Sequence, residues 1–425
     1  MKSVISILQE NRGISGWRVS ETKTDSYELF FVHRRLETVR NTSTASTSVT
    51  VYKEHDGKVG DSTFSIYESM TEDDIRKKVF AAERRASLIF NEKYSLPDAG
   101  TGQYDFDSNM EGMDFKVLGS EIAEAAFNAE TIPGCSINAL EIFIYRDVFS
   151  VKNSLGADKK QTKTRVMIEA IPTFTEGKES VELYEDIRFT EFRPEKITEE
   201  IRGKLEEAKA RFEARKPQVP MKTDVLLRAP ELSSVLWELA DDLNYAAKYA
   251  HSNLHDTDDD LQKEGGGDKL TVTLRGRIRG SDRSAFFDED GLALRDTCVI
   301  RNGIVTSNFG SNRFGQYLGV EEPSGNLPCI DVGAGTLTEA ERENMTYLEC
   351  VSMSGIQVEL FSDYIGGEIR LGYLCSGGKK TPVTGITMSG SLSAVLKDLR
   401  LSESRTQARS YSGPEYMLIR DMEIL

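Results

Sequence analysis

The sequence holds few residues whose types and spacing could support catalysis. Of its four histidines, only His251 and His255 lie close together. At positions i and i+4 near the end of a helix they could share a metal ion, and an acidic run begins at Asp256. Because Ser252 follows the first histidine, the glutamate that acts as general base in an HExxH motif is missing. A polar helix end that runs into a solvated acidic loop explains the same residues without a metal.

Two further stretches resemble ligand-binding loops but fail on spacing. The run DTDDDLQKEGGG, residues 256–267, has aspartates at alternate positions, as calcium loops do. Its sixth position is Leu261 where the turn needs glycine, and its twelfth is Gly267 where a bidentate glutamate is needed. The segment GYLCSGGKKT, residues 372–381, lacks P-loop spacing and lies between two predicted strands, so no helix N-terminus can hold phosphate. We therefore expect a surface loop and a hairpin turn.

An amphipathic helix is predicted over residues 230–250. Pro230 suits the first helical position, where its missing N–H has no consequence. The face opposite the apolar stripe carries Glu238, Asp241 and Asp242, which are the carboxylates best placed to do chemistry. The stripe, which must face a core, consists of Leu232, Leu236, Leu239, Leu243, Ala246 and Ala250.

Length and composition exclude several classes of protein. The chain has 425 residues, enough for two or three domains, and a net charge of −16, which argues against nucleic acid as the main partner. No segment approaches the roughly 18 apolar residues that a membrane span needs, and the N-terminus lacks the features of a signal peptide. The five cysteines are scattered and never form a CxxC pair. These features predict a cytoplasmic protein without a membrane anchor.

The order of predicted elements indicates an α+β fold with two domains. Each domain is expected to contain an antiparallel sheet with packed helices, and the C-terminal domain is expected to be β-rich. The two prolines of RKPQVP, residues 215–220, end a long charged helix, so we place the boundary there. The predicted domains are residues 1–215 and 216–425. Other helices are expected at residues 1–11, from Thr71 with Asp74 as a capping box, at 115–129 and at 196–214.

Several blocks in a fixed order resemble the TldD/PmbA (TldE) family. In the second half they are FFDEDGLALRDTCVIRNGIVTSNFGSNRFGQYLG (residues 286–319), PSGN (323–326) and GGKKTPVTGITMSGSLSAVLKDL (377–399). In the first half they are LETVRNTSTASTSVTVY (36–52) and VKNSLGA (151–157). This resemblance spans nearly the whole chain and implies a member of that metallopeptidase family, which is also described as modulators of DNA gyrase.

In that family, TldD carries the zinc motif HExxxH on a helix and a cysteine near the C-terminus, whereas TldE (PmbA) lacks these ligands. The matching positions here are Trp237 for the first histidine, Glu238 for the glutamate and Asp242 for the second histidine. Ser412 falls at the position of the cysteine. Without imidazole or thiolate ligands these residues make a poor zinc site. The chain therefore resembles the TldE/PmbA side of the pair.

The resemblance implies a non-catalytic subunit of a zinc peptidase that acts on unfolded or extended peptides. We expect no cofactor in this chain, zinc in a TldD-like partner, and dimerisation with that partner or with a second copy. One alternative is a stand-alone homodimer that binds peptides as a scaffold and does not hydrolyse them. Another is a divergent metallohydrolase that uses His251 and His255.

Overall fold

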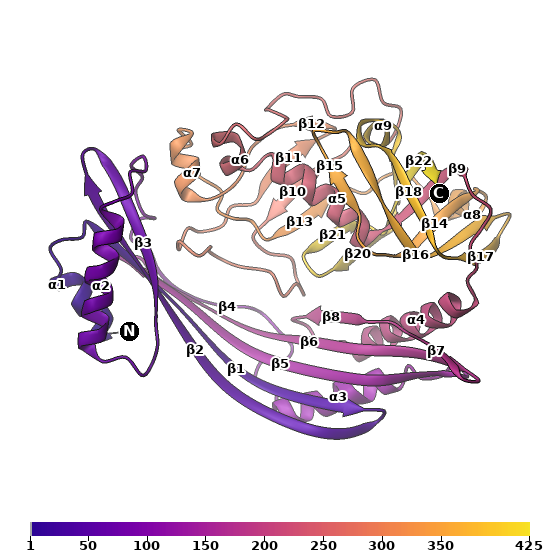
Figure 1. Cartoon of the computed structure of the whole chain (residues 1–425), viewed down its shortest axis with the longest axis horizontal. Helices are drawn as coiled ribbons and strands as arrows, with labels where there is room; N and C mark the ends of the chain where they lie inside the picture. The colour runs from indigo at the N-terminus through magenta and orange to yellow at the C-terminus, as the bar shows by residue number, and fades with distance from the viewer. Residues whose placement is uncertain (1) are drawn as a thin grey trace.

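The computed structural model describes residues 2–425, and their strands form three sheets. An eight-stranded sheet is built from residues 16–189, and a six-stranded and a second eight-stranded sheet are built from residues 221–424. In Figure 1 the long strands of the first sheet arch beneath the C-terminal half of the chain. This confirms the predicted α+β fold with a β-rich C-terminal half. Within the described residues, no helix is long and apolar enough to cross a membrane.

The N-terminal sheet is dominated by four long strands that run side by side (Figure 1). Alternating polar and apolar residues support strands of this length, because one face of the sheet is covered and the other is not. The strands are β1 (Gly16–Val32), β2 (Arg35–His55), β3 (Lys58–Ile66), β4 (Thr101–Asp105), β5 (Cys135–Asn153), β6 (Asp158–Glu176), β7 (Glu179–Glu182) and β8 (Glu185–Phe189). Their order is β3-β2-β1-β5-β6-β4, with β7 and β8 also paired to β6.

Helices cover this sheet at both of its ends. Near the N-terminus, α1 (Lys2–Glu10) and α2 (Glu72–Ala86) pack on β1, β2 and β3 around the buried side chain of Trp17. At the other end, α3 (Phe115–Phe127) and α4 (Pro194–Glu213) pack on β5 and β6. The predicted capping box at the start of α2 is present: the Asp74 N–H donates to the Thr71 hydroxyl and the Thr71 N–H donates to the Asp74 carboxylate.

The C-terminal half holds two sheets around one core. The six-stranded sheet has the order β12-β11-β10-β13-β21-β20. Its strands are β10 (Val272–Arg275), β11 (Thr297–Arg301), β12 (Ile304–Val305), β13 (Cys329–Val332), β20 (Arg405–Ala408) and β21 (Tyr411–Pro414). The second sheet consists of β9 (Met221–Arg228), β14 (Tyr347–Met353), β15 (Gln357–Glu359), β16 (Tyr364–Ser376), β17 (Lys379–Val383), β18 (Ile386–Ser391), β19 (Arg400–Leu401) and β22 (Tyr416–Ile424).

Strand pairing closes the second sheet into a ring of β14, β9, β22, β18 and β16, because β16 pairs with both β18 and β14. Closure removes the free edges that an open sheet would expose. The pairings β4–β6, β9–β14 and β13–β21 are parallel, so the predicted antiparallel pattern holds with these exceptions. The segment that resembled a P-loop is the β16–β17 hairpin, whose turn uses Gly377 and Gly378 at positive φ.

The helices of the C-terminal half are short except for one, and that helix lies at the centre of the core. They are α5 (Ala229–Asp242), α6 (Tyr245–Tyr249), α7 (Asn312–Tyr317), α8 (Glu339–Glu343) and α9 (Leu392–Asp398). The longest, α5, packs against β9, β15, β20, β21 and β22, which belong to both C-terminal sheets (Figure 1). The elements around α5 therefore fix the position of every residue on it.

A network of charges around two buried glutamates joins the two halves of the chain at the start of α5. Arg228, the last residue of β9, donates from Nη1 to Glu207 Oε1 on α4 at 2.8 Å. Its Nη2 donates to Glu349 Oε1 on β14 at 2.8 Å, and Lys380 donates to the other oxygen of Glu349 at 3.2 Å. Burial alone would raise the pKa of Glu349, but Arg228 and Lys380 hold it below its usual range.

Replacing this arginine with an uncharged side chain, Arg228→Met, should lower the free energy of unfolding by about 3 kcal/mol, because Glu349 stays buried without its main counterion. Urea unfolding measures the change. The folded-state pKa of Glu349 is lowered, so its stabilisation is complete above its unfolded pKa of about 4.3 and disappears as the pH falls through the folded value. The difference between the two proteins should therefore shrink in acid.

An exposed ion pair provides the control. Arg76 on α2 pairs with Glu10 at 2.9 Å, with both side chains largely in solvent. Arg76→Met should change the free energy of unfolding by about 0.5 kcal/mol or less. Equal losses in the two variants would show that the Arg228 network does not stabilise the contact between the two halves.

Candidate functional site

The predicted apolar stripe faces the core along α5 but not beyond it, because Ala246 is only half-buried and Ala250 is exposed. Leu232, Leu236 and Leu239 are buried, and Leu243, which follows the helix, is buried as well. The helix is shorter than expected, because α5 ends at Asp242. The predicted single helix over residues 230–250 is therefore wrong at its C-terminal third.

A side-chain cap explains the break. Asn244 has extended backbone geometry, and its side chain accepts a hydrogen bond from the Ala246 N–H at 2.9 Å, so it begins the separate helix α6. The Asn244 backbone also forms an isolated bridge with Phe309. These contacts turn the chain just after α5 and bring the segment that follows α6 back toward Asp242.

Trp237 and Glu238 occupy the middle of α5. The Trp237 side chain is half-buried and packs against the C-terminal core, so an indole fills this position. Glu238 is exposed, and its pKa is raised by partial burial and then by the neighbouring charges of Asp241 and Glu359. Within the described residues, the Glu238 carboxylate makes no hydrogen bond or ion pair with a side chain that could act as a nucleophile or a base.

Asp242, by contrast, points into the protein and is buried. Its Oδ1 accepts the Leu254 N–H at 2.6 Å, and its Oδ2 accepts the His255 N–H at 3.0 Å. The His255 ring nitrogen Nδ1 lies 2.9 Å from the same oxygen. Burial would raise the pKa of Asp242, but these hydrogen bonds outweigh it and hold the pKa below its usual range. This carboxylate anchors the turn after α6.

Ser412 lies on β21, a strand against which α5 packs. Its hydroxyl oxygen is 3.2 Å from Arg405 Nη2, and the same nitrogen donates to Asp331 Oδ1 at 2.7 Å. Arg275 donates to the other oxygen of Asp331, also at 2.7 Å. Ser412 therefore lies beside a network of ion pairs in which Asp331 bridges Arg405 and Arg275. Sequence reasoning missed Arg405 and Arg275, because the contacts join segments far apart in the chain.

The two histidines singled out from the sequence do not form a shared site. His255 is bound to Asp242, whereas His251 is exposed and has a left-handed backbone with φ +54°. The acidic loop that follows contributes Asp256 to an ion pair with Lys248 at 2.8 Å. Across residues 2–425, no three His, Cys, Asp or Glu side chains gather in an arrangement that could hold a metal ion.

The side chains at the family's ligand positions do not fit zinc. Trp237 offers no ligand atom, and both oxygens of Asp242 are used by the backbone and ring of the following turn. Ser412 offers a weakly binding hydroxyl next to a guanidinium, which repels a cation. Glu238 alone is a free carboxylate, and a single carboxylate does not make a tight zinc site.

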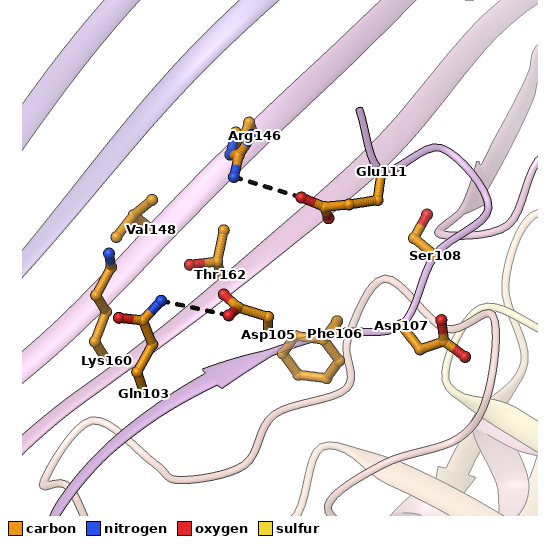
Figure 2. Close-up of a pocket in the computed structure, with 10 residues that line it drawn as sticks. All are labelled: Gln103, Asp105, Phe106, Asp107, Ser108, Glu111, Arg146, Val148, Lys160 and Thr162. Atoms are coloured by element: carbon orange, nitrogen blue, oxygen red, sulfur yellow. Dashed lines mark hydrogen bonds and ion pairs between the residues drawn. The ribbon is translucent and has the colours of Figure 1, made fainter. Parts of the chain in front are cut away.

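A second candidate site is a polar hollow of about 560 Å3 on the N-terminal sheet, shown in Figure 2. It lies where β4 and the loop after it meet β5 and β6, well away from α5 in the fold. Arg146 pairs with Glu111 at 3.5 Å across it, and Gln103 donates to Asp105 at 3.3 Å. Its polar groups thus bond mainly to one another. Its lining holds carboxylate, lysine and hydroxyl groups but no histidine or cysteine.

Comparison with known proteins relates the C-terminal half of the chain to a protein family. Residues 220–425 match the model of the PmbA/TldA metallopeptidase C-terminal domain. No curated protein sequence gave a match.

Solved structures resemble the chain over almost its whole length. TldE from Thermococcus kodakarensis has a TM-score of 0.79 at 12% identity and covers 99% of both chains. A candidate modulator of a DNA gyrase from Thermotoga maritima MSB8 has a TM-score of 0.79 at 13% identity. The match covers 100% of the present chain and 99% of the Thermotoga chain. A candidate modulator of DNA gyrase from Bacteroides thetaiotaomicron VPI-5482 has a TM-score of 0.80 at 14% identity. The match covers 100% of the present chain and 97% of the Bacteroides chain. These likenesses establish the fold.

Asp242→Asn should release the turn that the carboxylate anchors, because the amide can accept fewer of the hydrogen bonds. We expect a loss of about 1–3 kcal/mol in the free energy of unfolding and faster amide exchange over residues 251–258. Hydrogen–deuterium exchange measures the second effect. Since the folded-state pKa of Asp242 is lowered, its stabilisation is present above about pH 3.9 and disappears as the pH falls through the folded value.

The neighbouring Asp241→Asn is the matched control. Asp241 lies at the surface, where partial burial raises the pKa of its carboxylate. In the described structure this carboxylate accepts no hydrogen bond from the turn, so it has no anchoring role to lose. Its variant should leave exchange over residues 251–258 unchanged. Unchanged exchange in Asp242→Asn as well would contradict the anchoring role.

Proposed function

Because residues 220–425 place this chain in the PmbA/TldD family, we propose that it is a TldE-type subunit without catalytic activity of its own. In this proposal a separate TldD-type chain carries the zinc ion and performs hydrolysis. The present chain supplies an interface and part of the substrate enclosure. The two chains together act on unfolded or extended peptides.

The observation that carries the proposal is the use of Asp242 and Ser412. At the positions where the family's active chain has metal ligands, one side chain anchors a turn and the other contacts Arg405. Trp237 fills the third position with an indole that packs on the core. Each of the three side chains has a packing or hydrogen-bonding role that conflicts with holding a metal ion.

Two further features support the proposed role. The net charge of −16 gives no support to direct DNA binding, so a peptidase subunit accounts for the chain better than a DNA-binding role does. The hollow on the N-terminal sheet is polar and is lined by no histidine or cysteine, which is compatible with contact to a polypeptide.

The test compares the purified chain alone, a TldD-type chain with an HExxxH motif from the same organism, and the two mixed. We expect a stable complex on size-exclusion chromatography and faster cleavage of an unfolded fluorogenic peptide by the mixture than by the TldD-type chain alone. The present chain alone should neither cleave the peptide nor retain stoichiometric zinc after dialysis.

Two controls sharpen the result. A TldD-type chain with its motif glutamate changed to glutamine should still form the complex but should not cleave. Added zinc should not make the present chain active. Absence of both a complex and a gain in cleavage would contradict the proposal, and so would zinc-dependent cleavage by this chain alone that His255→Ala abolishes.

A further inference from the structure

The long strands of the N-terminal sheet have one face covered by helices and one face turned toward the C-terminal half. Helices α3 and α4 pack on Ile142, Ile144, Val166 and Ile168, which are alternate residues of β5 and β6. The residues between them point to the other side, because side chains alternate along a strand. Figure 1 shows the concave side of the arch turned toward the C-terminal half. This side is termed the inner face below.

The C-terminal half touches only part of the inner face. On β6, Lys159 donates to the Gly291 carbonyl and Lys163 to the Asp282 carbonyl, so a loop of the C-terminal half covers this stretch. Farther along the same strands lie the cross-strand pairs Glu141–Glu169 and Phe143–Met167. In the described chain, no hydrogen bond, ion pair or ring contact joins these four side chains to the C-terminal half. This stretch of the inner face therefore has no partner.

Two carboxylates face each other on this bare stretch. Glu141 and Glu169 are direct partners across the β5–β6 pair, a position in which like charges repel. Both side chains are partly exposed, and neither forms an ion pair in the described structure. Glu169 accepts a hydrogen bond from the Tyr184 hydroxyl at 2.8 Å. Burial and then the charge of Glu169 raise the pKa of Glu141.

Neighbouring carboxylates of the inner face do have counterions. Glu28 pairs with Arg40, and Asp147 pairs with Arg165 at 2.5 Å. The negative charge that remains unbalanced on this part of the face is therefore that of the Glu141–Glu169 pair.

Apolar side chains border the two carboxylates. Phe30 faces Glu141 across the β1–β5 pair, and Phe143 and Met167 are the next residues along the inner face. The Phe30 and Phe143 rings meet edge to face at 5.7 Å. Lysine and arginine side chains combine an apolar stem with a cationic end, and aromatic rings attract cations. The surface next to the carboxylates thus matches the stem of a basic side chain.

We propose that the carboxylates of Glu141 and Glu169, bordered by Phe30, Phe143 and Met167, bind a lysine or arginine side chain of an unfolded peptide. The backbones of β5 and β6 are already paired within the sheet, so this face recognises side chains and not a peptide backbone. The unbalanced negative charge favours a basic segment and repels an acidic one. That such a peptide is a substrate rests on the proposed function, whereas its binding needs no second chain.

Fluorescence anisotropy of the purified full chain tests the site. The probes are three labelled, unstructured peptides of equal length that carry two central lysines, two glutamines or two glutamates, and the lysine peptide should bind most tightly. Glu141→Gln/Glu169→Gln should weaken binding of the lysine peptide by about fivefold to tenfold and leave binding of the glutamine peptide unchanged. Glu141→Lys/Glu169→Lys should reverse the preference toward the glutamate peptide, which a folding defect cannot do.

The matched control removes the same charge from the other side of the sheet. Glu199 and Glu206 are exposed on α4 and form no ion pair in the described structure. Glu199→Gln/Glu206→Gln should bind the lysine peptide like the unmodified chain. An equal loss of affinity in this control would overturn the proposal, because net charge alone would then explain binding. Equal affinity of the unmodified chain for all three peptides would overturn it as well.

Complex formation with a TldD-type chain is measured separately, so the two proposals can fail independently. Lysine-selective binding without a complex would support this site and contradict the subunit role. A complex whose present chain binds the three peptides equally would support the subunit role and overturn the site.

Discussion

Arg228 links the two halves of this chain at the start of α5. The guanidinium bridges Glu207 on α4 and Glu349 on β14, and it lies directly before the first residue of α5. Buried charges of this kind are tolerated only when each has its partner. The network therefore ties α4, which packs on the arched sheet, to the C-terminal sheet at the point where α5 begins.

In the C-terminal half, Asp242, His255 and Ser412 are residue types that often take part in catalysis, but here their side chains make structural contacts. Asp242 and His255 form the kind of pair found in hydrolases, yet here the carboxylate binds backbone N–H groups as well as the ring, and it is buried. Ser412 lies beside a guanidinium that is itself held by Asp331. In both places a polar group is satisfied from inside the fold, which stabilises the core and leaves no ligand atom free for a cation.

The two halves of the molecule differ in whether the edges of their sheets are paired. The C-terminal sheet closes on itself through the pairing of β16 with β14 and β18, so it presents little edge to a partner. The N-terminal sheet stays open, and one side of β2 is left without a strand. The unpaired side of β2 therefore keeps backbone groups exposed, whereas the closed sheet satisfies most of its own.

The sequence by itself determined the features that depend on near neighbours. The stripe of Leu232, Leu236 and Leu239 and the Thr71 capping box follow from spacings of three or four residues, and the family blocks follow from the order of motifs. Only the tertiary structure decided that Asp242 anchors a turn, that Arg405 lies against Ser412, and that part of β2 has no partner. The break after α5 also escaped prediction, because an apolar stripe continues through residue 243 while the Asn244 cap and its bridge to Phe309 end the helix. Most of these contacts join segments that meet only after the chain folds, whereas the Asn244 cap is local and was obscured by the apolar stripe that continues past it.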